Sequence, residues 1–182
     1  MVETRKDGTL RVSDDLWEYF QVFFSNLKWE NYQKAMAEEV LPITFVHGDF
    51  HPGNIMWLPD DPVCRVRFLD WEIVSLDYGP KELGQYVIAA VDMSEYGVDA
   101  QSQWVKSYYE ELVAINPSIE NKCSFEACFN NFVIGGIRKW LIYLARFSTI
   151  NLRLFYSFAD QVDTFRKLHC VQPQNVGYPP TC

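Results

Sequence analysis

The chain has 182 residues, of which 48% are hydrophobic and 16% aromatic, so it can bury the core of a folded domain and is not a disordered protein. Its 16 Lys and Arg stand against 24 Asp and Glu, a formal net charge of −8. This balance argues against nucleic-acid binding, which needs a basic face for phosphates. It permits a cationic small-molecule substrate, an inference with little weight because most acidic proteins are merely soluble.

Neither a signal peptide nor a membrane span is expected. The first fifteen residues are polar, and the most apolar stretch, residues 132–147, is interrupted by Arg138, Lys139 and Arg146. The five cysteines form no CxxC pair, and their odd number and irregular spacing predict free thiols in a reducing compartment such as the cytoplasm. They are Cys64, Cys123, Cys128, Cys170 and Cys182.

The first predicted element is a helix that Ser13 caps, with Asp14 and Asp15 in a first turn where carboxylates suit the helix dipole. Its apolar residues follow helical spacing and can extend the helix as far as the stop at Pro42. These residues are Leu16, Phe20, Phe23, Phe24 and Leu27, with Tyr32 and Met36 beyond them.

Three short strands are expected next. Residues 43–46 predict a buried strand, residues 55–58 a second, and residues 63–69 a third, with the turn PDDP before the third. A dense polar loop, residues 47–54, joins the first two strands.

From Lys81 onward the pattern is helical. Helices are expected over about 81–91, over about 100–114 ending at Asn116-Pro117, over a long segment that includes residues 125–144, and near 157–169. A Pro-rich, frayed tail is expected over 172–182. No linker or repeat divides residues 1–171, so a single α+β domain is predicted, in which three strands carry the polar loop among helices.

The polar loop places chemistry-bearing residues together. Asp49 follows a predicted strand, Asn54 precedes the next, and Asp70 ends the third, so a hairpin can bring these residues to one edge. Two carboxylates and an amide oxygen there can serve phosphoryl transfer, because one carboxylate orients a hydroxyl while the others hold magnesium. Gly48, Gly53 and Pro52 would let the loop turn tightly and stiffen it.

The motifs HGDFHPGN and LDWE, in this order and spacing, resemble those of the aminoglycoside phosphotransferase and choline kinase-like family, which has the protein kinase-like fold. By this resemblance Asp49 is the catalytic aspartate, Asn54 and Asp70 are the magnesium and cofactor-binding residues, and His47 with Gly48 shapes the loop. The downstream segment SLDYGPKEL resembles a further family segment, where the family usually has aspartate and this chain has Glu82.

The resemblance covers residues 43–91 and implies the mainly helical large lobe of a kinase, with residues 1–171 as that lobe. It implies transfer of the γ-phosphoryl group of ATP, with Mg²⁺, to a hydroxyl group of a small molecule such as an aminoglycoside or choline-like acceptor. The family's small amino-terminal lobe has no counterpart in the roughly forty residues before the motif, and Lys6 is a poor candidate for its lysine. We therefore expect a fragment, a truncated form or a degenerate relative, whose isolated chain is inactive.

Two alternatives stay open. A non-catalytic binding or regulatory protein could keep the large lobe without phosphotransfer. A metal-dependent hydrolase could use His47, Asp49 and His51, although the third histidine, His169, lies near the tail. Other residues have structural interpretations: His51 is expected to be solvated, Glu72 to make a local contact and Asp77 to lie in a turn. The tryptophans Trp57, Trp104 and Trp140 are expected in the core.

Overall fold

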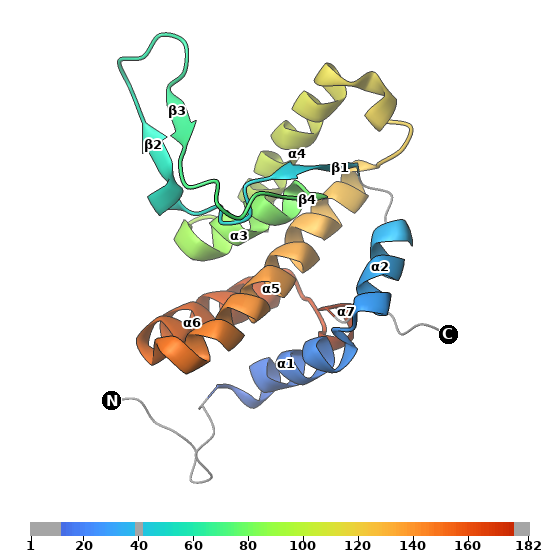
Figure 1. Cartoon of the computed structure of the whole chain (residues 1–182), viewed down its shortest axis with the longest axis vertical. Coiled ribbons are helices and arrows are strands. Elements are labelled where there is room, and N and C mark those ends of the chain that lie inside the picture. The colour runs from blue at the N-terminus through green and yellow to red at the C-terminus, as the bar shows by residue number, and fades with distance from the viewer. Residues whose placement is uncertain (1–11, 39–41, 177–182) are drawn as a thin grey trace. The chain divides into compact units, whose positions relative to one another are not determined.

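The computed structural model describes residues 12–38 and 42–176 (Figure 1). Contacts divide the chain into two compact units. The terminal unit comprises residues 1–40 and 137–182, and the loop unit comprises residues 41–136. Helix α5 (Phe125–Ile150) contributes residues to both units, and each unit is described separately below.

In the terminal unit, the single long helix expected at the start of the chain is two helices, α1 (Asp14–Asn26) and α2 (Trp29–Glu38). Ser13 caps α1 as predicted, because its hydroxyl accepts a hydrogen bond from the Leu16 N–H at 3.1 Å. The break follows Asn26, whose carbonyl accepts a bond of 3.0 Å from the Asn31 side chain. A side chain thus satisfies a carbonyl at the end of α1, and one continuous helix was the wrong prediction.

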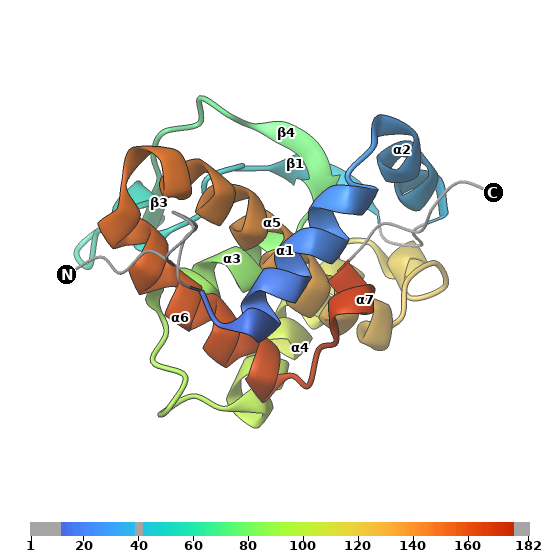
Figure 2. The same ribbon diagram turned by 90° about the horizontal axis from the view of Figure 1, so that it is seen from below.

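The core of the terminal unit is aromatic. Figure 2 shows α1 beside α6 (Leu152–Leu168) and α7 (Pro173–Val176). The Phe20 and Phe155 rings lie 6.4 Å apart, and the Arg166 guanidinium lies 4.7 Å from the centre of the Tyr19 ring. The tail was expected to be frayed from residue 172, but Val176 in α7 is buried. The remaining residues of the predicted tail, 177–182, lie outside the described part of the chain, as do Lys6 and Cys182.

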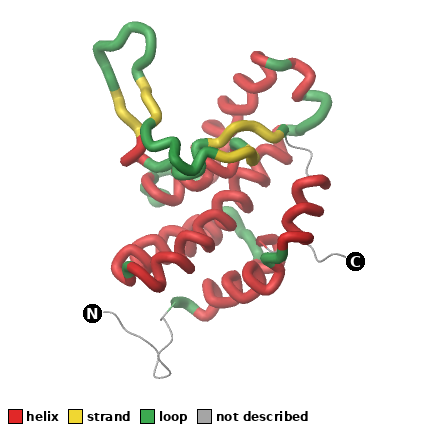
Figure 3. Tube along the Cα trace, viewed as in Figure 1, coloured by secondary structure: helices red, strands yellow, loops and turns green. Residues whose placement is uncertain are grey.

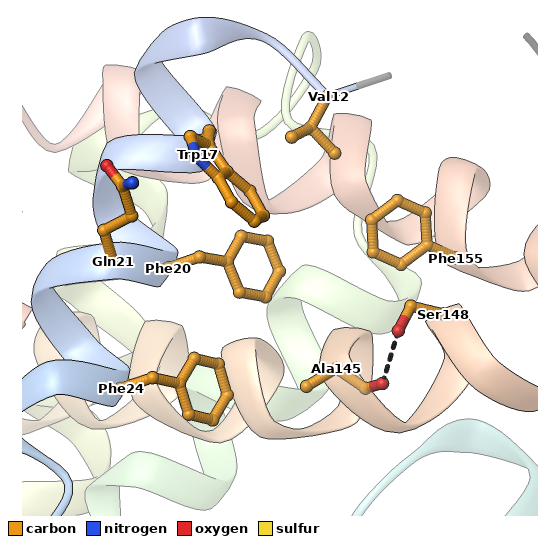
Figure 4. Close-up of a pocket in the computed structure, with 8 residues that line it drawn as sticks. All are labelled: Val12, Trp17, Phe20, Gln21, Phe24, Ala145, Ser148 and Phe155. Carbon is orange, nitrogen blue, oxygen red and sulfur yellow. Dashed lines mark hydrogen bonds between the residues drawn. The ribbon is translucent and has the colours of Figure 1, made fainter. Parts of the chain in front are cut away.

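An open cavity of about 300 Å³ lies between α1, α5 and α6 of this unit. Figure 4 shows Trp17, Phe20 and Phe24 of α1 facing it, with Phe155 across from them. Val12, at the edge of the described residues, also lines it.

The loop unit contains two antiparallel pairs of strands (Figure 3). Strand β1 (Ile43–Val46) pairs with β4 (Ser75–Tyr78), with Ile43 opposite Tyr78. Strand β2 (Ile55–Trp57) pairs with β3 (Val66–Phe68), with Ile55 opposite Phe68. The three predicted strands are present, the third shorter than expected. Strand β4 was missed, and Asp77, expected in a turn, is a buried residue of that strand.

Strand β1 was expected to be buried, but only Val46 of its four residues is. Phe45 is 76% exposed, and its cross-strand partner Leu76 is 59% exposed. These side chains share a face of the pair that no described residue covers. Trp57 and Trp104 are likewise exposed rather than in the core, whereas Trp140 is buried as predicted.

The expected helices are confirmed as α3 (Pro80–Ala90), α4 (Val98–Ile115), α5 and α6. Figure 1 shows α3 running beneath the β1–β4 pair. In the loop unit α3 packs closely on α5 through Gly84, where an added Cβ would lie 2.1 Å from the Phe132 carbonyl oxygen. None of the helices in the described chain is both long and apolar enough to cross a membrane. The four cysteines of the described chain are free thiols.

Candidate functional site

The polar loop between β1 and β2 turns sharply at Gly48, which has a φ of 88°. An added Cβ at this position would lie 2.2 Å from the Ile73 carbonyl oxygen. The left-handed backbone and the close approach of Ile73 both favour glycine. At the other end, Pro52–Asn54 form a single turn of 3₁₀ helix that leads into β2.

Glu82 in the first turn of α3 holds the start of the loop. Its carboxylate oxygens accept bonds from two successive backbone N–H groups, that of His47 at 2.7 Å and that of Gly48 at 2.6 Å. Glu82 is buried, so these charge-assisted bonds lie in a region of low dielectric constant and are strong. The family usually has aspartate in this segment, and here glutamate makes the contact with the loop.

The buried His47 ring uses both of its nitrogens. Nε2 lies 2.6 Å from the Leu69 carbonyl oxygen, which can only accept, so Nε2 carries the hydrogen. Nδ1 then accepts from the Asp49 N–H at 3.3 Å. The ring therefore joins the loop to the segment before Asp70, which agrees with a structural role for His47.

Asn54, the last residue of the polar loop, holds that end of the loop by hydrogen bonds. Its side-chain nitrogen donates to the Asp49 carbonyl oxygen at 3.0 Å, and its own carbonyl oxygen accepts from the Leu69 N–H at 2.9 Å. Because the amide nitrogen holds the loop, Oδ1 is the atom that Asn54 can offer to a cation. The structure thus places Asn54 next to Asp49 on one side and next to the Leu69–Asp70 peptide on the other.

Asp70 follows directly and has a φ of 61°, a left-handed conformation that few residues other than glycine adopt. Leu69 before it is held at both its N–H, by Asn54, and its carbonyl, by His47. Trp71 after it lies with its ring 4.7 Å from the His47 ring, and its indole N–H donates to Phe68. Uncommon backbone of this kind often occurs at functional sites when its surroundings impose it.

The Asp49 carboxylate is partly open to solvent, with its side chain 35% exposed. Gln85 of α3, which is buried, places Nε2 3.5 Å from Oδ1, and His51 places Nε2 3.5 Å from Oδ2. His51 also accepts a bond from the Gly53 N–H through Nδ1. His51 was expected to be solvated, but its ring contacts two residues of the loop, Asp49 and Gly53.

The oxygen atoms of Asn54 and Asp70 fit Mg²⁺, which prefers hard oxygen ligands and is usually bound by few side chains together with substrate phosphates. A zinc site of His47, Asp49 and His51 does not fit. His47 has no nitrogen left for a metal, and the described residues include no group of three His, Cys, Asp or Glu that could hold one. This arrangement therefore does not support the hydrolase alternative.

Two residues of α3 were not identified from the sequence as parts of the site. Glu82 binds the loop backbone and Gln85, one helical turn later, faces Asp49. Their spacing of three residues places them on one helical face, and this pattern of polar residues on a buried face could have indicated them. Asp77, in the strand before α3, forms an ion pair with Lys81.

Replacing Gly48 with alanine is expected to lower the free energy of unfolding by about 2 kcal/mol, because alanine disfavours the left-handed backbone and its Cβ meets Ile73. Gly97 is the matched control, since an added Cβ there would have nothing within 4 Å. Because Gly97 is the N-cap of α4, where glycine is preferred to alanine, Gly97→Ala should still lower the free energy of unfolding by less than about 1 kcal/mol. Urea denaturation of both variants measures the difference, and equal stabilities would contradict the assigned loop conformation.

Comparison with known proteins finds a family model that matches part of the chain. Residues 7–78 match the model of the phosphotransferase enzyme family, a segment that includes the polar loop and Asp70. No curated protein matches the chain. The match agrees with the resemblance to a phosphotransferase family over these residues. The family implies a protein kinase-like fold, and the helical structure with two small sheets is compatible with it.

Proposed function

We propose that the loop unit carries the catalytic centre of an ATP-dependent phosphotransferase that acts on a hydroxyl group of a small molecule. One observation carries the proposal. The Asn54 side chain is hydrogen-bonded to the Asp49 backbone, and the Asn54 backbone is hydrogen-bonded to the residue before Asp70, which supports a common site for the three residues that the family motifs single out. The match of residues 7–78 to the phosphotransferase family supports the same reaction class.

Each residue has a role that its surroundings permit. Asp49, partly exposed and backed by Gln85, would accept or orient the hydroxyl proton of the acceptor. Asn54 through Oδ1 and Asp70 through its carboxylate would hold Mg²⁺. When bound with ATP, that ion would neutralise charge on the phosphates. Glu82 and His47 would keep these groups in position.

The acceptor belongs to the class of aminoglycosides, choline or related hydroxyl compounds, by analogy with the family.

We further propose that residues 1–182 represent the large lobe of a kinase-like protein. The exposed Phe45 and Leu76 support this view, because they form an apolar face on which another lobe could pack. Residues 1–182 by themselves are expected to transfer little phosphate, because they include no lobe that could cover the phosphates, and a non-catalytic role remains the second candidate.

Metal preference tests the proposed site. After subtraction of Mg²⁺ binding to free ATP, titration calorimetry of the chain should show further Mg²⁺ binding that requires ATP, because the phosphates complete the coordination shell. Asp70→Ala should abolish it, whereas Asp60→Ala, a change of an exposed aspartate in the β2–β3 turn, should not. Tight zinc binding without nucleotide, lost in His51→Ala and unchanged in Asp70→Ala, would refute the phosphotransferase site and restore the hydrolase.

A further inference from the structure

A second cavity, of about 250 Å³, lies in the loop unit between α3, α4 and α5. Val87 of α3, Val105 of α4 and Phe132 of α5 form its buried floor. Trp104 at its edge is 40% exposed, and the Trp104 ring lies 5.6 Å from Tyr96. The cavity therefore has a tightly packed base and an aromatic edge that reaches solvent.

The lining determines which ligand the cavity can take. Its accessible wall is entirely apolar, so it offers no partner to an ion or a sugar, and burying such a ligand there would be costly. An apolar cavity of about 150 Å³ is large enough for a benzene ring. A volume of about 250 Å³ therefore suits one aromatic ring with a short alkyl substituent.

One residue that lines the cavity also contacts the polar loop of residues 47–54. Tyr86 of α3 lines the cavity, and its ring lies 5.5 Å from the ring of Phe50, the residue after Asp49. Phe50 in turn lies 5.5 Å from Phe68 of β3. The neighbouring α3 residues Glu82 and Gln85 contact the loop directly. A molecule in the cavity would therefore touch the helix that positions Asp49.

We propose that the cavity between α3, α4 and α5 is a binding site for a small, uncharged aromatic or alkyl-aromatic molecule, and that Tyr86 and Phe50 transmit its occupancy to the catalytic loop. No ligand is proposed for the cavity of the terminal unit, because that cavity borders residues whose structure is not described. Binding in the cavity and its effect on the polar loop do not depend on phosphotransfer, since both concern the folded loop unit.

Binding is measured with fluorotoluene by fluorine NMR on the purified chain. We expect saturable binding with a dissociation constant on the order of 1 mM, together with shifts of the Phe50 and Tyr86 backbone amide signals. Val105→Phe, at the floor, and Leu83→Phe, at the half-buried wall, should each weaken binding by about tenfold or more, because the added ring fills the cavity. Using two positions keeps the test valid if one variant fails to fold.

Ala145→Phe is the matched control, because it introduces the same phenylalanine side chain into the cavity of the terminal unit. It should leave the affinity for fluorotoluene unchanged. Absence of saturable binding to the unmodified chain would overturn the proposal. Loss of binding in Ala145→Phe, with retention in both loop-unit variants, would also overturn it, and so would binding without any shift of the Phe50 amide.

Discussion

Replacing Asp49 with asparagine is expected to lower phosphotransfer turnover by about 10²–10⁴-fold, the usual contribution of a positioned general base. Asparagine keeps the side-chain volume but cannot accept the proton of the acceptor hydroxyl. The fold should persist, because the loop is held through the backbone carbonyl of Asp49, which the substitution keeps. The measurement is steady-state ATP-dependent phosphorylation of amino-sugar and choline-like acceptors, in a form of the protein that also carries a phosphate-covering lobe.

The control for this prediction is Asp60→Asn, which removes an exposed carboxylate from the β2–β3 turn of the same unit. Its turnover should equal that of the unmodified protein. Near-parental turnover of Asp49→Asn would show that Asp49 is not the catalytic base. If turnover fell equally in Asp49→Asn and Asp60→Asn, the cause would be the general loss of negative charge.

Replacing Glu82 with glutamine is expected to lower the free energy of unfolding by about 4 kcal/mol, because one buried charge-assisted hydrogen bond is lost and the other becomes a neutral bond. Glutamine has one acceptor oxygen, so its NH₂ group would face one of the two backbone N–H groups. Hydrogen exchange of the His47 and Gly48 amides should accelerate in the variant, and urea denaturation measures the loss of stability.

Glu110→Gln provides the matched control, since Glu110 on α4 is exposed and only pairs loosely with Lys106 at 3.8 Å. Exposed pairs of this kind contribute little, so its stability should change by less than about 0.5 kcal/mol. If Glu82→Gln were as stable as Glu110→Gln, with unchanged amide exchange at Gly48, the carboxylate would not be what holds the loop.

The helices and most strands could be predicted because their signals are local. Ser13 and the two aspartates after it mark the start of α1, and Asn116-Pro117 marks the end of α4. The break after Asn26 could not be predicted in the same way, because it depends on a side-chain bond from Asn31 to the Asn26 carbonyl. The helical spacing of the apolar residues continues past Asn26, so the sequence pattern alone predicts one unbroken helix.

Burial was harder to predict than secondary structure. Phe45, Leu76 and Trp57 have side chains typical of a core, yet all three are exposed. Their exposure depends on which elements cover the two small sheets, and a pattern of residue types does not contain that information. Strand β4 was missed for a related reason, since its pairing with β1 joins residues about thirty positions apart.

The candidate site could be located because Asp49, Asn54 and Asp70 stand in short motifs at fixed spacing. What the sequence left open was how they are held. The contacts of Glu82 with two loop amides, and of His47 with Leu69, join segments between 22 and 35 residues apart. Such bonds become visible only when the positions of α3 and the strands are known.

We propose that Asn54 and Asp70 form one oxygen site for a cation carried with ATP. The most direct test is nuclear relaxation by Mn²⁺, which prefers the same oxygen ligands as Mg²⁺. With ATP present, the NMR signals of the Asn54 side-chain amide and the Asp70 backbone amide should broaden most, and Asp70→Ala should remove this effect. Broadening centred elsewhere in the chain, or equal broadening in Asp70→Ala, would contradict the assigned site.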